Sequence, residues 1–202
     1  MKGSRDIRKV YPNSLSHTSA VWNLMSGILE KKFIFSTNII IDNMKDFHLL
    51  KDLHFNRGLI QNPDTYLQDA GCASWLFLIG EEFASMEGGM SYDQVKAATP
   101  YSLNVISDPP RVLNLDLAKQ HVEALDALPR PTLISCRSGP RASAVAYMYS
   151  GLKLGADPDD VLAEAEKDQA PFVKFDDYKE WVRSSMESLR TASDLSERSH
   201  KE

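Results

Sequence analysis

Cys136 lies in the segment CRSGPRAS, between an apolar run and a stretch of good helix formers. Gly139 permits a tight turn, so that the backbone amides of this loop gather at the start of a helix, where they can bind an anion. The same positive helix end favours a thiolate over a thiol, which makes Cys136 a candidate nucleophile. The alternative is a small buried hydrophobe, which is the interpretation we prefer for the other cysteine, Cys72.

Two arginines accompany the thiol. Arg141 follows Cys136 with four residues between them and falls in the first turn of the expected helix. Its guanidinium group can donate two parallel hydrogen bonds to a bound oxyanion. Arg137 adds positive charge beside the sulfur. Because an arginine in a first helical turn opposes the helix dipole, the pattern predicts a site whose charge is balanced by an anion.

Strands and helices must alternate along the chain to position this loop. Apolar runs of strand length predict strands within 58–60, 73–80, 101–107 and 131–135. Helical spacing and capping residues predict helices within 62–71, 113–128, 141–152, 159–167 and 176–189. This alternation predicts an α/β fold with a mostly parallel central sheet and helices on both faces. Ligands bind beyond the carboxyl ends of such strands, and Cys136 directly follows the strand at 131–135.

The loop resembles the active-site loops of two groups of cysteine enzymes. One is the cysteine-dependent phosphatases, especially the small phosphatase-like family linked to β-lactamase-hydrolase-like proteins (domain of unknown function 442), and the other is the rhodaneses. Standard tyrosine and dual-specificity phosphatases place five residues between Cys and Arg, whereas four are typical of rhodaneses and of that phosphatase-like family. The flanks lack the further rhodanese segments, and GLIQNPDTYLQDAGCASWLFLIGEE is similar to the phosphatase-like pattern. The resemblance covers about residues 55–154 and implies a protein tyrosine/dual-specificity phosphatase-like fold.

The resemblance also implies a reaction, the hydrolysis of a phosphomonoester. Cys136 would attack phosphorus to form a thiophosphoryl-cysteine intermediate, which water then hydrolyses, while Arg141 and the loop amides hold the phosphoryl oxygens. No cofactor and no metal are expected. The positions implied to bind substrate are Arg137, Ser138, Gly139, Ala142 and Ser143. Ser143 either eases departure of the thiolate or only bonds to the helix backbone.

Asp108 is the candidate general acid. It ends the strand at 101–107, whose carboxyl end can lie beside that of the strand before Cys136. The alternative is that Asp108 and Pro109 only start a turn, and Asp116 is a further candidate for the acid. Two departures from the phosphatase pattern are Pro140, which lacks an N–H for the loop, and Ser135, which stands where standard phosphatases have His.

Two other functions use the same loop. A rhodanese-type sulfurtransferase would carry sulfur as a Cys136 persulfide. A non-catalytic module would keep the anion-binding loop and bind phosphorylated ligands without turning them over. The fate of the Cys136 sulfur, phosphorylated by a phosphomonoester or persulfidated by thiosulfate, distinguishes these hypotheses.

The 202 residues divide into a flexible tail (1–20), an N-terminal extension of uncertain packing (21–54), a phosphatase-like domain (55–189) and a disordered tail (190–202). We expect a helix near 20–33 and a strand near 33–42 in the extension, and we expect His121 to face solvent. The net charge of −5 argues against nucleic acid as a partner and leaves a small anionic or phosphorylated substrate. The oligomeric state stays open.

The expected location follows from weaker signals. Only two cysteines are present, which favours a reducing compartment, and we expect a cytoplasmic protein without a membrane span. The basic first nine residues, followed by serines, weakly resemble a transit peptide, so that a mitochondrion or plastid is the alternative.

Overall fold

The computed structural model describes residues 47–107 and 111–199. The predicted helix near 20–33, the predicted strand near 33–42 and the candidate acid Asp108 lie outside the described residues. None of the helices described is long and apolar enough to cross a membrane.

Four parallel strands form the central sheet, in the order β1-β4-β2-β3. They are β1 (Leu53–Phe55), β2 (Ser74–Phe77), β3 (Ser102–Asn104) and β4 (Thr132–Ser135). Every residue of β2 and β4 is buried, as their continuous apolar sequences require of strands covered on both sides. The predicted parallel sheet is confirmed, and β4, which leads to Cys136, lies inside it between β1 and β2.

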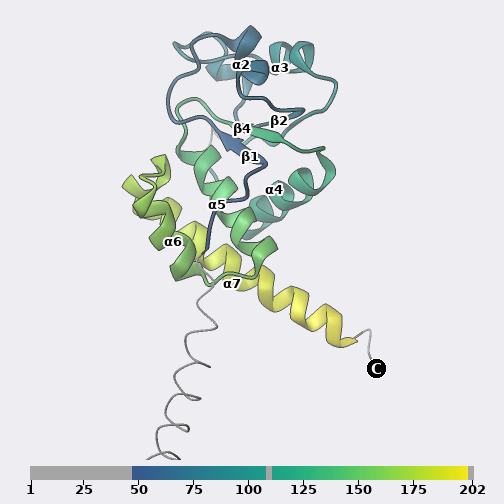
Figure 1. Ribbon diagram of the computed structural model, residues 1–202, viewed down its shortest axis with the longest axis vertical. Coiled ribbons are helices and arrows are strands. Elements are labelled where there is room, and N and C mark those ends of the chain that lie inside the picture. The colour runs from purple at the N-terminus through teal and green to yellow at the C-terminus, as the bar shows by residue number, and fades with distance from the viewer. Residues whose placement is uncertain (1–46, 108–110, 200–202) are drawn as a thin grey trace, which may run out of the picture. The chain divides into compact units, whose positions relative to one another are not determined.

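Helices cover both faces of the sheet (Figure 1). One face carries α2 (Pro63–Asp69) and α3 (Tyr92–Ala98). The other face carries α4 (Leu115–Ala127) and α5 (Pro140–Leu154), with α6 (Pro158–Lys167) and α7 (Asp176–Ser199) packed beyond them. Pro63, Pro140 and Pro158 each stand in a first helical turn, where the missing N–H has no intrahelical partner to lose.

The helix α5 is the centre of the second layer. Its residues from Arg141 to Gly151 are all buried, because β4 and β1 cover one side of the helix while α4, α6 and α7 cover the others. A helix that is apolar all round is stable only in such an interior position. The first turn of α5 is therefore held rigidly, and that turn carries Arg141.

The first strand differs from its prediction. The segment 58–60 is not a strand; instead, residues 53–55 pair with β4 while Ile60 packs into the core without pairing. Short apolar runs do not distinguish a strand from a buried loop, which explains the error. Phe47 is also buried, so that core residues begin inside the segment that we assigned to the N-terminal extension.

His121 is not exposed to solvent as the sequence suggested. It is fully buried on α4, with its ring edge-on to Trp181 of α7 at 5.8 Å between centroids. The helical pattern of α4 showed one apolar face, but α7 packs across α4 and covers a second one. Burial, together with the positive charge of Arg141, lowers the pKa of His121 to about 3, so the imidazole is neutral in the folded protein.

The chain end also differs from expectation. We predicted disorder from residue 190, whereas α7 continues to Ser199. The segment after residue 189 contains neither Gly nor Pro, and the Thr191 hydroxyl donates to the carbonyl of Glu187 one turn earlier. Forming the first turn of a helix is unfavourable, whereas each further residue adds a hydrogen bond. Because the first half of α7 is already formed and packed, the helix can continue through its later turns.

Candidate active site

The loop between β4 and α5 turns sharply at Gly139. Its φ of +107° lies in the region that favours glycine, and a Cβ there would lie 2.4 Å from the carbonyl oxygen of Asn56. Any other residue would have to displace the backbone after β1. The turn lets α5 begin at Pro140, and the helical hydrogen bonding starts with the Ser143 N–H bonded to the Gly139 carbonyl.

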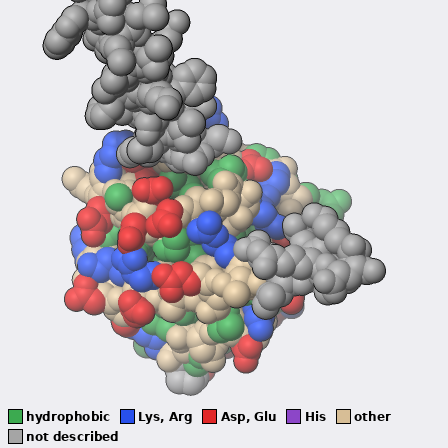
Figure 2. Space-filling model, turned by 90° about the horizontal axis from the view of Figure 1, so that it is seen from below, with side chains coloured by type: hydrophobic (Ala, Val, Ile, Leu, Met, Phe, Trp, Pro, Cys, Tyr) green, Lys and Arg blue, Asp and Glu red, His purple; other side chains and the backbone are tan. Residues whose placement is uncertain are grey.

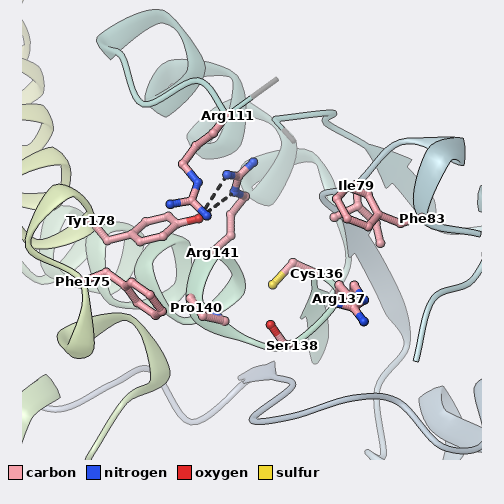
Figure 3. A pocket seen from close by; sticks show the side chains of 10 residues that line it. All are labelled: Ile79, Phe83, Arg111, Cys136, Arg137, Ser138, Pro140, Arg141, Phe175 and Tyr178. Carbon is pink, nitrogen blue, oxygen red and sulfur yellow. Dashed lines mark hydrogen bonds between the residues drawn. The ribbon is translucent and has the colours of Figure 1, made fainter. Parts of the chain in front are cut away.

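The sulfur of Cys136 lies at this turn and faces a cavity of about 370 Å³. Its Sγ accepts a hydrogen bond from the Gly139 N–H at 3.2 Å, and only 6% of the residue is exposed. Figure 3 shows the sulfur between the side chains of the cavity wall, with Arg141 on one side and Arg137 on the other. The cavity is lined by Ile79, Phe83, Arg111, Cys136, Arg137, Ser138, Pro140, Arg141, Phe175 and Tyr178.

Arg141 is buried and held by two hydroxyl groups. Its Nη1 donates to Ser107 Oγ at 2.6 Å, while its Nη2 and Nε donate to the Tyr178 hydroxyl at 3.0 and 3.4 Å. Only 2% of the arginine is exposed. Both hydroxyls are neutral, since burial raises the pKa of Tyr178 although Arg141 opposes this effect. These contacts fix the guanidinium group in the wall of the cavity that also holds the thiol.

Asn56 fixes the backbone of Cys136 from the neighbouring strand. The residue directly follows β1, and its Nδ2 donates to the carbonyl oxygens of Cys136 and Gly58, both at 2.8 Å. Its Oδ1 accepts from the Cys136 N–H at 3.1 Å. Asn56 is 1% exposed, so these bonds form away from water. A buried polar group that lacks a hydrogen-bond partner lowers the stability of the fold.

The residues expected to bind substrate divide into two groups. Arg137 and Ser138 line the cavity, and Gly139 supplies the turn and the N–H to the sulfur. Ala142 and Ser143 are fully buried and their side chains do not line it, so that their part in substrate binding stays a prediction. The first turn of α5 directs these two side chains into the core.

Ser143 has backbone partners that account for its hydroxyl. The Oγ donates to the Pro140 carbonyl at 2.9 Å and accepts from the Phe172 N–H at 3.2 Å. Of the two interpretations given for this residue, the bond to the helix backbone is the one observed. The hydroxyl ties the start of α5 to the segment before α7.

Other candidates lie away from the sulfur or act elsewhere. Asp116 is exposed, pairs with Lys119 at 3.8 Å and does not line the cavity. Ser135 is buried on β4, where its Oγ accepts from Trp75 Nε1 at 2.7 Å. Burial raises the pKa of Cys72 to about 11, in keeping with an unreactive thiol.

Several residues of the site were not found from the sequence. Asn56 and Ser107 both follow a strand at its carboxyl end, so the rule that selected Cys136 would have selected them had the strand ends been known. Tyr178 and Phe175 come from the region of α7, far along the chain, and nothing in their local sequence marks them. Arg111 stands just before α4, where it resembles any solvated arginine.

A metal ion needs a group of side chains that can bind it. Within residues 47–107 and 111–199 there is no group of three or more His, Cys, Asp or Glu side chains that could hold a metal ion.

Comparisons with known proteins identify the fold. No family model matches the sequence, and no curated protein matches it. A mutant form of Tk-PTP superposes with a TM-score of 0.54 at 14% identity, over 71% of this chain and 95% of that one. A protein of Neisseria meningitidis z2491 described as a phosphatase candidate gives a TM-score of 0.50 at 13% identity, over 71% and 99% of the two chains. PTPMT1 gives 0.50 at 12% identity, over 70% and 95%.

These likenesses extend over nearly the whole of each neighbour. The chain therefore has the α/β fold of the tyrosine and dual-specificity phosphatase-like proteins, with a four-stranded parallel sheet between two helical layers. At such low identities the similarity concerns the fold. What the site does must be argued from its own residues.

Proposed function

We propose that the protein is a phosphatase that hydrolyses phosphomonoesters through Cys136. The observation that carries the proposal is the placement of the sulfur: it faces a cavity at the start of α5, accepts the Gly139 N–H and shares the cavity with buried Arg141. A helix start and a guanidinium group together stabilise both a thiolate and a phosphoryl dianion. Membership of the phosphatase-like family with domain of unknown function 442 is part of the same proposal.

The proposed reaction has two steps. The Cys136 thiolate attacks phosphorus, a P–S bond forms, and the P–O bond to the leaving alcohol breaks while the alcohol oxygen takes up a proton. Water then attacks phosphorus, the P–S bond breaks, and inorganic phosphate leaves with the thiolate restored. Arg141 and the loop N–H groups hold the equatorial oxygens in both steps.

Asp108 remains the proposed donor of the proton to the leaving alcohol. It follows Ser107 in the sequence, and the Ser107 hydroxyl accepts from Arg141. The chain therefore reaches the arginine at the residue before Asp108, and the proposal for Asp108 rests on this adjacency in the sequence. The two-step scheme does not depend on this assignment, because a poor acid slows only the leaving of strongly basic alcohols.

The test is to trap the intermediate. The full chain is mixed with ³²P-labelled p-nitrophenyl phosphate and quenched in acid, and we expect label on the wild type but none on Cys136→Ser. Cys72→Ser is the matched control and should retain the label. Arg141→Lys keeps the charge but not the forked geometry, and we expect kcat/KM to fall at least about a hundred-fold.

Other outcomes would favour the other hypotheses. A persulfide formed on Cys136 from thiosulfate, without labelling by the phosphate ester, would establish sulfur transfer instead. Tight binding of a phosphopeptide with no label and no turnover would establish a binding module. Either result overturns the phosphatase proposal.

A further inference from the structure

The cavity over Cys136 concentrates positive charge. Three of the residues that line it are arginines, namely Arg111, Arg137 and Arg141, and none of its described lining residues is acidic. The chain as a whole carries a net charge of −5. On the face shown in Figure 2, by contrast, Lys and Arg side chains are interspersed with Asp and Glu. The lining of the cavity therefore differs in charge from that face, and Asp177 is the acidic residue that pairs with one of its arginines.

One phosphoryl group does not use all of this charge. Arg141 is buried near the sulfur, and together with the loop amides it provides for the group that reacts. Arg137 follows Cys136 directly and holds its place through an Nε bond to the Glu87 carbonyl at 3.3 Å. Arg111 comes from a different element and is the cation farthest along the chain from the reactive loop.

Arg111 is held in a defined position by Tyr178 and Asp177. Its guanidinium carbon lies 5.3 Å from the centroid of the Tyr178 ring, and its Nη1 is 3.2 Å from Asp177 Oδ2. Arg141 contacts the same tyrosine, with its guanidinium carbon 5.8 Å from that centroid. Figure 3 shows the two guanidinium groups together at the hydroxyl end of the ring. Each of these two guanidinium groups can donate hydrogen bonds to an anionic group of a bound molecule.

The cavity has room for such a molecule. Its volume of about 370 Å³ is that of a small-molecule pocket and exceeds what a phosphoryl group fills. Phe83, Phe175 and Ile79 supply apolar parts of the cavity wall, which suit a flat or apolar linking portion. Of these, Phe175 is 41% exposed and so lies near the mouth of the cavity, whereas Ile79 is buried.

We propose that the preferred substrate is a phosphomonoester whose leaving group carries a second anionic group, a carboxylate or phosphate, and that Arg111 binds this second group. The inference rests on the proposed function for the reacting end of the molecule. It adds the substrate class and names a specificity-determining residue outside the reactive loop.

The experiment compares 4-carboxyphenyl phosphate with 4-carbamoylphenyl phosphate, and likewise their 3-substituted isomers. The two esters of each pair have nearly the same shape and differ by one negative charge. We expect wild-type kcat/KM to favour the carboxylate ester by about ten-fold or more for at least one isomer, the worth of one charge-assisted hydrogen bond. Arg111→Ala should reduce that preference to about two-fold or less.

Arg137→Ala is the matched control, since it removes another arginine of the same cavity. We expect it to lower both rates by a similar factor and so to keep the preference. The ratio between the esters is compared across variants, so that the different leaving tendencies of the two phenols cancel. A wild-type ratio near one for both isomers, or an unchanged ratio in Arg111→Ala, overturns the proposal.

Binding measurements separate this inference from the proposed function. Calorimetric affinities of the same esters are measured on Cys136→Ser and on Cys136→Ser with Arg111→Ala. If the wild type turns over neither ester, the phosphatase proposal fails. A carboxylate preference in binding that needs Arg111 then still supports the second anion site, and equal affinities for the two esters refute it.

Discussion

Asn56 and Cys136 show how the placement of the proposed nucleophile depends on a neighbouring side chain that has no role in the proposed reaction. The asparagine binds both backbone polar groups of Cys136 and also borders Gly139, whose Cβ position is closed off by the Asn56 carbonyl. The sulfur is thus placed by the strand beside its own. Preorganisation of this kind lets the loop bind an anion without first having to rearrange.

Replacing Asn56 tests this dependence. Asn56→Ala removes three hydrogen bonds, two of them buried, and leaves the Cys136 N–H and carbonyl without these partners. We expect a loss of roughly 2–4 kcal/mol in the free energy of unfolding, measured by urea denaturation, and at least ten-fold lower kcat/KM. The control is Thr99→Val, whose buried hydroxyl bonds to the backbone of Ala73 and Tyr101 at the opposite end of β2 from the loop. If both variants kept full activity, Asn56 would have no role in placing the thiol.

The two cysteines should differ in reactivity. Burial raises the pKa of Cys72 to about 11, so at neutral pH this residue stays a thiol. We expect iodoacetamide at pH 7 to label Cys136 first, as measured by mass spectrometry of the digested protein. Excess phosphate should slow that labelling and leave the labelling of Cys72 unchanged. Faster reaction at Cys72 would contradict the proposed thiolate at Cys136.

The site residues that are close together in the sequence could be predicted, whereas those that come from distant segments could not. The thiol, the turn glycine and Arg141 lie within six consecutive residues, so their joint chemistry could be recognised directly. Asn56 and Tyr178 reach the same place only through the pairing of β1 with β4 and the packing of α7 on α5. No local pattern encodes those contacts.

The helix α7 contributes to the site as an element. It packs on α5, so that the Tyr178 hydroxyl accepts a hydrogen bond from Arg141. The ring of Tyr178 also contacts the guanidinium group of Arg111. The sequence predicted a helix at 176–189 but gave no sign of which side would face the cavity. An amphipathic pattern can indicate which face of a helix is buried, whereas the partner of that face depends on the tertiary fold.

Tyr178→Phe tests the positioning of Arg141 by this helix. The change removes only the hydroxyl that accepts from Nη2 and Nε. We expect kcat/KM for p-nitrophenyl phosphate to fall about three- to thirty-fold. Tyr149→Phe is the control, since its hydroxyl bonds to Asp126 outside the cavity. Both variants should lose comparable stability, and equal activity in the two would show that Tyr178 does not orient the arginine.

The sequence predicted the fully buried strands correctly, but it did not predict the short strand β1. The runs that became β2 and β4 are apolar throughout and could be placed with little ambiguity. The three-residue β1 has no such signal, and its sequence LHF is as short as the nearby GLI. Pairing with β4, a contact between distant segments, decided which of the two forms a strand.

At the scale of the whole molecule, buried His121 links stability to pH. Its pKa of about 3 in the folded protein lies below the value of 6.5 for an exposed histidine, because burial disfavours the charged form. Between these values the unfolded chain binds a proton that the folded chain does not. Stability is therefore lost as the pH falls below 6.5.

His121→Phe should remove this dependence while keeping an aromatic contact with Trp181. We expect the wild type to lose about 2 kcal/mol more stability than the variant between pH 7.5 and pH 5. Urea denaturation at the two pH values measures the difference. Identical pH dependence in both proteins would show that the imidazole becomes protonated inside the fold.

The reactive groups and the cavity mouth belong to different parts of the molecule. Cys136 and Arg141 are anchored to β4 and α5, whose side chains are almost entirely enclosed, whereas Phe83, Arg111 and Phe175 stand in connecting segments and meet the solvent more freely. Changes at the three outer positions can alter which molecules are admitted without disturbing the groups that react. Such a separation makes these three positions the natural starting points for changing the specificity of the proposed phosphatase.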